Sequence, residues 1–111
     1  MKKILILLLM LLSLNAGAQR IYRCSWKSDA DVKVYVTDWK SEADLVVYIT
    51  DWSSEAYKTN RGIWHFTDWK SEADKKIYFV KWKSDADLII YFTSWKSEAG
   101  WRKSNKKYLL K

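Results

Sequence analysis

Residues 39–51 read WKSEADLVVYITD, and variants of this phrase fill almost the whole chain. A Trp opens each copy, and these residues are Trp26, Trp39, Trp52, Trp69, Trp82 and Trp95. The copies are 13 residues long, except that the third and the sixth are 17. Residues 26–68 and 69–111 therefore align without a gap as two 43-residue halves, and residues 19–25 match the end of a copy. The period indicates one small structural unit, repeated and then duplicated.

The second part of each copy alternates between two faces, as the side chains of a β-strand do. Val47 and Ile49 share one face of such a strand, and Tyr48 lies on the other. Five residues before each Trp stand Ile21, Val34, Val47, Trp64, Ile77 and Ile90; three residues before it stand Arg23, Val36, Ile49, Phe66, Phe79 and Phe92. The opposite face carries a Tyr column, a Thr-rich column and the Trp itself. Because aromatic side chains dominate core burial, we expect most of these rings to be buried or partly buried packing.

The alternation predicts an all-β fold of seven short, internally duplicated strands of about 6–7 residues each. The first strand comes from residues 19–25. The last is expected in the basic C-terminal segment, where Lys107 and Leu109 continue the two columns. Residues 19–111 would then form a single domain.

The connection between strands reads W-K-S-[DE]-A-D and contains neither Gly nor Pro in most copies. Ser28 precedes Asp31 by three residues, a spacing that resembles a capping box and would hold one helical turn. A solvated acidic turn without a specific cap is an equally good interpretation. The third and sixth copies replace the second acid with Tyr57 and Gly100 and are longer, and both longer loops are basic.

The N-terminus has the organisation of a bacterial secretory signal peptide. Lys2 and Lys3 precede an apolar run, and the small residues Ala16-Gly17-Ala18 follow it. The run is shorter than the roughly 20 residues that span a bilayer, so we expect cleavage after Ala18 rather than a stable membrane anchor. Residues 1–18 are therefore interpreted as a signal peptide, and the mature domain is predicted to be secreted or periplasmic.

The repeated W-K-S-x-A-D-x-x-[IV]-Y-[FV]-[TV] phrase and the Lys-Ser-Asn-Lys-Lys ending resemble the septoil-knot family, a group of small bacterial domains. The resemblance covers residues 19–111. It implies a β-rich chain tied into a seven-crossing torus knot, and it brings no activity, cofactor or ligand with it. Two equal halves are compatible with a chain that winds twice around a common axis.

Two functions remain open from the sequence. The first is a non-catalytic structural domain whose winding makes it kinetically very stable. The alternative is a module that binds glycans, cell-wall polymers or another anionic envelope polymer through aromatic residues near the two long loops. The candidate ligand-binding residues are Tyr57, Trp64, Trp101, Arg102 and Lys103. Secretion argues against nucleic acid as a partner.

Enzymatic, metal and cofactor chemistry is not expected. Acid pairs such as Asp29/Asp31 recur in four copies, whereas a catalytic site needs one special environment. The single His, His65, occupies a Tyr position and is interpreted as a packed, hydrogen-bonded residue. The single Cys, Cys24, excludes a disulfide scaffold and a zinc finger, and is expected to be buried or to form an intermolecular disulfide.

Overall fold

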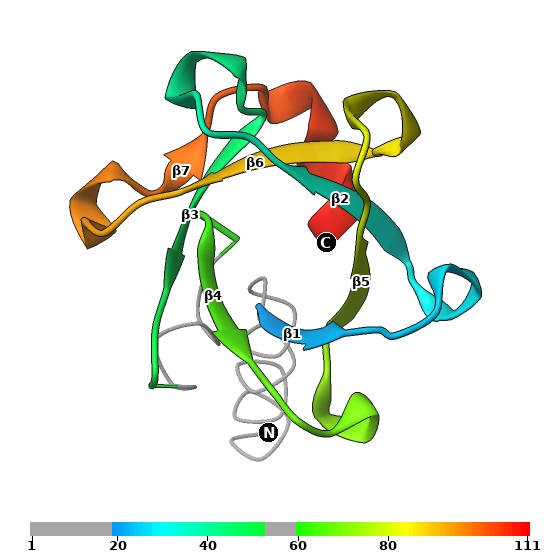
Figure 1. Cartoon of the computed structure of the whole chain (residues 1–111). Coiled ribbons are helices and arrows are strands. Elements are labelled where there is room, and N and C mark those ends of the chain that lie inside the picture. The colour runs from blue at the N-terminus through cyan, green and yellow to red at the C-terminus, as the bar shows by residue number, and fades with distance from the viewer. Residues whose placement is uncertain (1–18, 53–59) are drawn as a thin grey trace, which may run out of the picture.

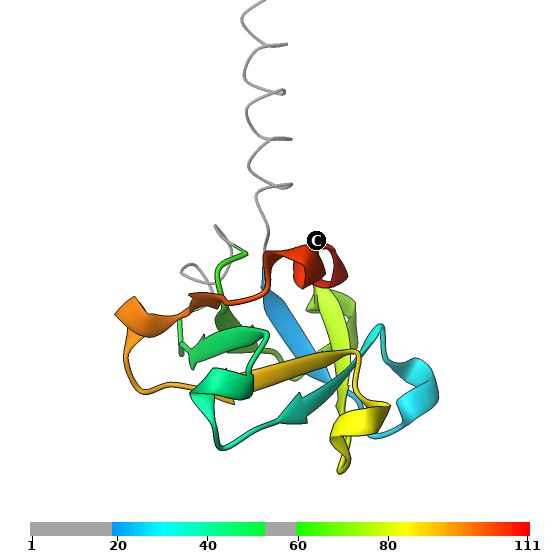
Figure 2. The same cartoon turned by 90° about the horizontal axis from the view of Figure 1, so that it is seen from above.

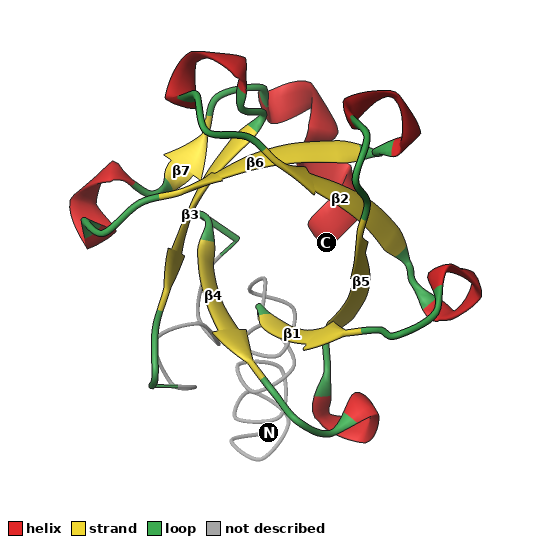
Figure 3. Cartoon of the chain, in the orientation of Figure 1, coloured by secondary structure: helices red, strands yellow, loops and turns green. Residues whose placement is uncertain are grey.

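A computed structural model describes residues 19–52 and 60–111 and contains a closed barrel of six parallel strands (Figures 1 and 3). The strands are β1 (Arg20–Arg23), β2 (Val32–Val36), β3 (Leu45–Ile49), β4 (Ile63–Phe66), β5 (Lys75–Phe79) and β6 (Leu88–Phe92). The fold is therefore all-β with short helical connections, as the alternating pattern predicts. The expected signal peptide, residues 1–18, lies outside the described residues.

Strands from the two halves of the chain alternate around the barrel. The order is β4-β1-β5-β2-β6-β3, and a β3–β4 pairing closes the ring. Each ladder between barrel strands joins one of β1–β3 to one of β4–β6, and all six ladders are parallel. The first three strands leave gaps that the next three fill, so neither set forms a sheet alone.

The barrel interior is filled by side chains stacked in layers. The middle layer is the column five residues before each Trp, and all six members have no exposed surface: Ile21, Val34, Val47, Trp64, Ile77 and Ile90. Val32, Leu45 and Leu88 form the layer nearer the amino ends of the strands. Trp64 is the one large ring among aliphatic neighbours, and it meets Phe66 edge-on with centroids 6.2 Å apart. The Tyr column on the outer face is half-buried.

Five connections project from the barrel as short 3-10 turns, which we call the arms (Figure 1). Their helical residues are η1 (Lys27–Asp29), η2 (Lys40–Glu42), η3 (Lys70–Glu72), η4 (Lys83–Asp85) and η5 (Lys96–Glu98). A Trp is the N-cap residue of each arm, and none of these caps makes a side-chain hydrogen bond. The prediction of one helical turn is confirmed, but the capping-box interpretation is wrong.

The last strand was predicted in the wrong place. Ser104–Leu110 is a 3-10 helix, η6, and the seventh strand is the two-residue β7 (Gly100–Trp101), antiparallel to β3. The edge of β3 is shared, because its first half pairs with β7 and its second half with β4. No edge is left for a long seventh strand, and Leu110 instead packs into the core, where its side chain is buried.

The C-terminal helix η6 lies across one end of the barrel, where the N- and C-terminal parts of the domain meet (Figure 2). The buried Gln19 donates an Nε2–H bond to the carbonyl of Leu110 at 3.0 Å. The opposite end, at the carboxyl ends of the strands, has no such cover among the described residues. Across residues 19–52 and 60–111, no helix has the length and apolar character to cross a bilayer.

Gly62, at the start of β4, cannot be replaced without strain. Its φ is +82°, and a Cβ there would collide with the carbonyl oxygen of Val46. We expect Gly62→Ala to lower stability by about 2–4 kcal/mol, because a left-handed backbone and a steric clash add. Thermal unfolding followed by intrinsic fluorescence measures this. Gly100→Ala is the control for the clash: its φ is also positive, at +156°, but its Cβ would meet no atom within 4 Å. Its loss should be smaller, and an equal loss in both variants contradicts the steric explanation.

Candidate functional site

The repeated Trp side chains stand out on the surface of the protein. The six rings are 67–71% exposed. The expectation that these aromatics serve as core packing is therefore wrong for this column, while the interior is mostly aliphatic. The alternation of a strand ends before the Trp, so its ring no longer belongs to either face of the barrel. Large exposed apolar side chains repeated this regularly mark an interaction surface.

In four of the six copies, a Thr two residues earlier holds the backbone of the Trp. Thr37 Oγ1 accepts a hydrogen bond from the Trp39 N–H at 3.1 Å and donates one to Glu42 Oε2 at 3.0 Å. The same acceptor bond holds Trp52, Trp69 and Trp95, and Thr67 and Thr93 also donate to the Glu of their arm. These hydrogen bonds fix the backbone at the four Trp residues.

The Thr and the Glu of an arm change together, which sequence analysis missed. Where the Thr is replaced by Cys24 or Val80, the acid is the shorter Asp29 or Asp85. Without a hydroxyl to reach, the longer Glu side chain has no hydrogen-bond partner at this position. An alignment of the copies with one another would show this joint change, because the Thr position and the Glu position lie five residues apart in every copy.

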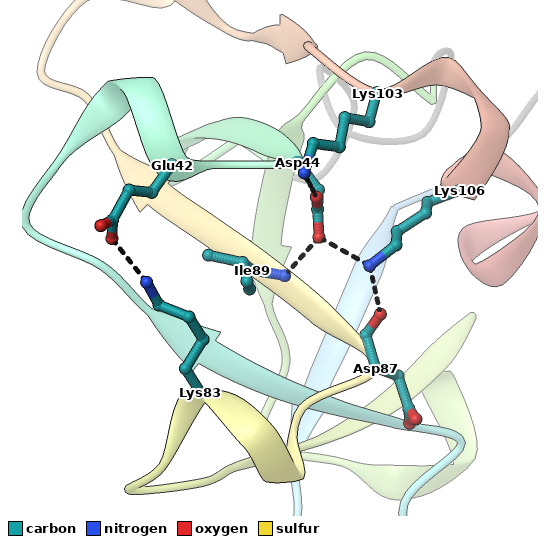
Figure 4. Close-up of polar contacts among 7 residues, drawn as sticks. All are labelled: Glu42, Asp44, Lys83, Asp87, Ile89, Lys103 and Lys106. Carbon is teal, nitrogen blue, oxygen red and sulfur yellow. Dashed lines mark hydrogen bonds and ion pairs between the residues drawn. The ribbon is translucent and has the colours of Figure 1, made fainter.

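Ion pairs connect neighbouring arms. Lys83 Nζ lies 2.9 Å from Glu42 Oε2 (Figure 4), and the pairs Lys40–Glu98 and Lys70–Asp29 measure 3.4 and 3.6 Å. The hydrogen bonds from Lys83 and Thr37 lower the pKa of Glu42, and Glu42 in turn raises the pKa of Lys83. These pairs are exposed to water, so they orient the arms more than they stabilise the fold.

The second acid of the arm has a different role, which is to continue the strand ladder. Asp31 donates its N–H to the carbonyl of Lys76 at 2.7 Å, and its Oδ2 accepts the N–H of the same residue at 3.0 Å. This two-bond clamp recurs in the pairs Asp44–Ile89, Asp74–Arg20 and Asp87–Lys33. Each clamp joins the end of an arm to a strand of the other half, so the repeated carboxylates serve strand pairing.

Asp44 also anchors the C-terminal segment (Figure 4). Its side chain is fully buried, with Lys103 Nζ 3.3 Å from Oδ1 and Lys106 Nζ 3.2 Å from Oδ2. Its carbonyl accepts the N–H groups of Arg102 and Lys103. Burial alone would raise the pKa of Asp44, but the Ile89 N–H and the two lysines outweigh it and lower the pKa.

The structure separates the five candidate ligand-binding residues. Trp64 is buried in the core with no exposed surface, so its proposed role in stacking on a ligand is wrong. Trp101 is partly buried and donates its indole N–H to the Asn60 carbonyl at 2.9 Å. Arg102 is exposed, Lys103 is paired with Asp44, and Tyr57 lies outside the described residues.

The one His and the one Cys of the chain, His65 and Cys24, are both packed against the rest of the domain. His65 is half-buried, and its Nδ1 lies 3.0 Å from the Thr50 carbonyl, which confirms a packed and hydrogen-bonded histidine. Cys24 is 5% exposed, and burial raises the pKa of its thiol. A protonated thiol is a poor nucleophile.

The uncovered end of the barrel forms a second surface of interest. The column three residues before each Trp ends here, and Val36, Ile49 and Phe92 are 36–37% exposed. A cavity of about 550 Å³ opens at this end, lined by Tyr22, Arg23, Phe66, Thr67, Asp68, Phe79 and Phe92. Four different strands or the turns that follow them contribute to its walls.

We expect Asp44→Asn to destabilise the domain at neutral pH, because the amide cannot pair with Lys103 and Lys106. The folded-state pKa of Asp44 is lowered, so its stabilisation is complete above the ordinary aspartate pKa of 3.8 and disappears as the pH falls further. The gap in stability between wild type and variant should therefore close in acid. Denaturant unfolding at several pH values measures it.

Asp31→Asn is the matched control for Asp44→Asn. Asp31 occupies the same position of the repeat and forms the same clamp, but none of the described lysines pairs with its carboxylate. The Asn oxygen can still accept the Lys76 N–H, so little loss is expected. A pH-independent loss in Asp44→Asn, or an equal loss in the control, contradicts the role of the lysine pairs.

Comparison with known proteins gives one match. No curated protein and no solved structure matches the chain. A family model described as the 7(1) septoil knot domain matches residues 18–102, which contain all six barrel strands and all five arms. This is the family that the repeated phrase resembles, and the match covers most of the chain. The protein therefore belongs to the 7(1) septoil knot domain family.

Proposed function

We propose that this protein is a non-catalytic structural domain, secreted or periplasmic, whose knotted winding makes it kinetically very stable. The observation that carries the proposal is the alternation of the two halves around the barrel, since β1–β3 and β4–β6 pair only across the halves. The signal-like residues 1–18 support export, and family membership supports the knot.

The pairing distances explain why unfolding should be slow. Partners in most ladders and clamps lie 45 or 54 residues apart in sequence. Such non-local contacts slow folding, and in a knotted chain the strands must also be threaded and unthreaded. No half can open while the other keeps its sheet, so a protease gains access only when most of the barrel is lost.

We expect the mature chain, residues 19–111, to unfold over hours in guanidinium concentrations above its midpoint. The change in Trp fluorescence reports loss of the core, because the six arm-type Trp rings are already exposed in the folded state while Trp64 is buried. Thermolysin digestion in native buffer should be slower still, because the unfolding rate falls as denaturant is removed. The Gly62→Ala variant is the control: because its strain arises in the folded state, we expect it to unfold faster by the same readout. Unfolding of the wild type within seconds contradicts the proposal.

The exposed Trp column supports a second function, the binding of a glycan or cell-wall polymer. Flat indole rings stack on the apolar faces of sugars, and the ring at the start of each of the five arms lies on a turn that carries a Lys and an acid. Several equivalent arms on one rigid barrel would bind a repeating polymer with higher avidity than any single arm. The scaffold function and this one are compatible, because slow unfolding preserves the arrangement of the arms.

We expect substitution of Trp39, Trp69 and Trp82 by Ala to weaken retention on insoluble peptidoglycan or chitin cumulatively, with each substitution costing about 1 kcal/mol or less. The rings are 67–69% exposed, so the melting temperature should barely change. The matched control replaces Tyr108, which is 66% exposed but lies on η6 rather than on an arm. Equal retention of the triple variant and the wild type contradicts polymer binding by the arms.

A further inference from the structure

The open end of the barrel differs from the opposite end in what covers it. Helix η6 closes one end with Leu110, which is buried. At the other end, a layer of apolar side chains lies directly above the fully buried middle layer and is exposed to solvent in part: Val36, Ile49, Phe66, Phe79 and Phe92. The cavity of about 550 Å³ at this end lies in the size range of small-molecule sites, which is roughly 300–1,000 Å³.

One position of this layer carries a charged residue, although the equivalent positions in the other five strands are apolar. The position is Val, Ile or Phe in five strands but Arg23 in β1. Arg23 is exposed, and its guanidinium lies over the Phe79 ring, 4.9 Å from the ring centroid, at the cavity wall. None of the described carboxylates forms an ion pair with it. A charge introduced at one copy of an otherwise apolar position indicates a local role.

Asp68 also lines the cavity, but its position differs from that of Arg23 in two respects. It lies two residues beyond Phe66, where β4 has ended, whereas Arg23 lies within β1; both side chains are exposed. An Asp also stands at this position in two other copies, as Asp38 and Asp51. Asp68 thus follows the repeat, whereas Arg23 departs from it. Arg23 is the charge that lies within the apolar layer.

We propose that the open end of the barrel binds a small amphiphile that carries one carboxylate or sulfonate group on an apolar body. The planar guanidinium of Arg23 matches the two oxygens of such a head group. The apolar body would pack on Phe66, Phe79 and Phe92 and cover the part of this layer that is now exposed. None of the described Trp side chains lines this cavity, so the proposed site does not depend on polymer binding by the arms.

The test uses dodecanoate below its micelle-forming concentration, titrated into residues 19–111 by calorimetry. We expect saturable binding to one site. Arg23→Gln should weaken dodecanoate binding about ten-fold or more while binding of uncharged dodecanol changes little. Phe92→Ser should weaken both. Lys81→Gln is the matched control: it removes a cation near the same end of the barrel that does not line the cavity, and should leave both affinities unchanged.

Four outcomes overturn the proposal: no saturable binding of monomeric dodecanoate, an unchanged affinity in Arg23→Gln, tighter binding of dodecyltrimethylammonium than of dodecanoate, or binding only to phosphatidylglycerol vesicles. The third would assign the site to Asp68 and a cation. The Trp39/Trp69/Trp82 triple variant should keep dodecanoate binding. Failure of this site and failure of the polymer site are therefore distinguishable, and circular dichroism of each variant establishes that it is folded.

Discussion

Hydrogen bonding between the two halves of the chain is the constraint on which the rest of the structure depends. β1, β2 and β3 form no ladder with one another, and β4, β5 and β6 form none either. Each barrel strand therefore needs partners from the other half, and the barrel exists only when both are in place. This explains why the repeat is duplicated: a second set of equal spacing fills the gaps that the first set leaves. It also makes partial unfolding costly, because opening one strand leaves the edges of two others unpaired.

The Asp clamps extend this pairing into the connections. An arm must leave one strand, pass over a neighbour and enter the next, and its backbone would otherwise lose ladder bonds on the way. The carboxylate of Asp31 or Asp87 supplies an acceptor where the strand is about to begin. With the path of the arm fixed in this way, the Trp at its start contributes little to the core. Its exposed ring is available for contacts with other molecules. The Asp at the end of the arm is hydrogen-bonded to a barrel strand at the same time.

Much of the fold could be predicted because the relevant signals are local. Alternation of buried apolar and more exposed residues, as in Val32–Val36, reflects the two faces of a strand, and six of the seven expected strands are found in the barrel. The failures concern positions whose environment depends on distant residues. Leu109 and Leu110 continue the columns but end in a helix, because the edge of β3 is already occupied. Trp64 looked accessible beside a long loop, yet it shares a column with Val47 and fills the interior.

The sequence alone determined the repeat, its duplication, the positions of the six barrel strands and the short turns between them, because each depends on residues within one copy of the phrase. Only the tertiary structure decided which strands are neighbours, which side chains remain exposed and which end of the barrel is open. These depend on pairings across 45 or 54 residues, and a repeated sequence offers several equivalent partners for every strand. The choice is made by closure: with six strands and a shared β3 edge, the interleaved order leaves no barrel edge unpaired and places Arg23 alone among apolar side chains at the open end.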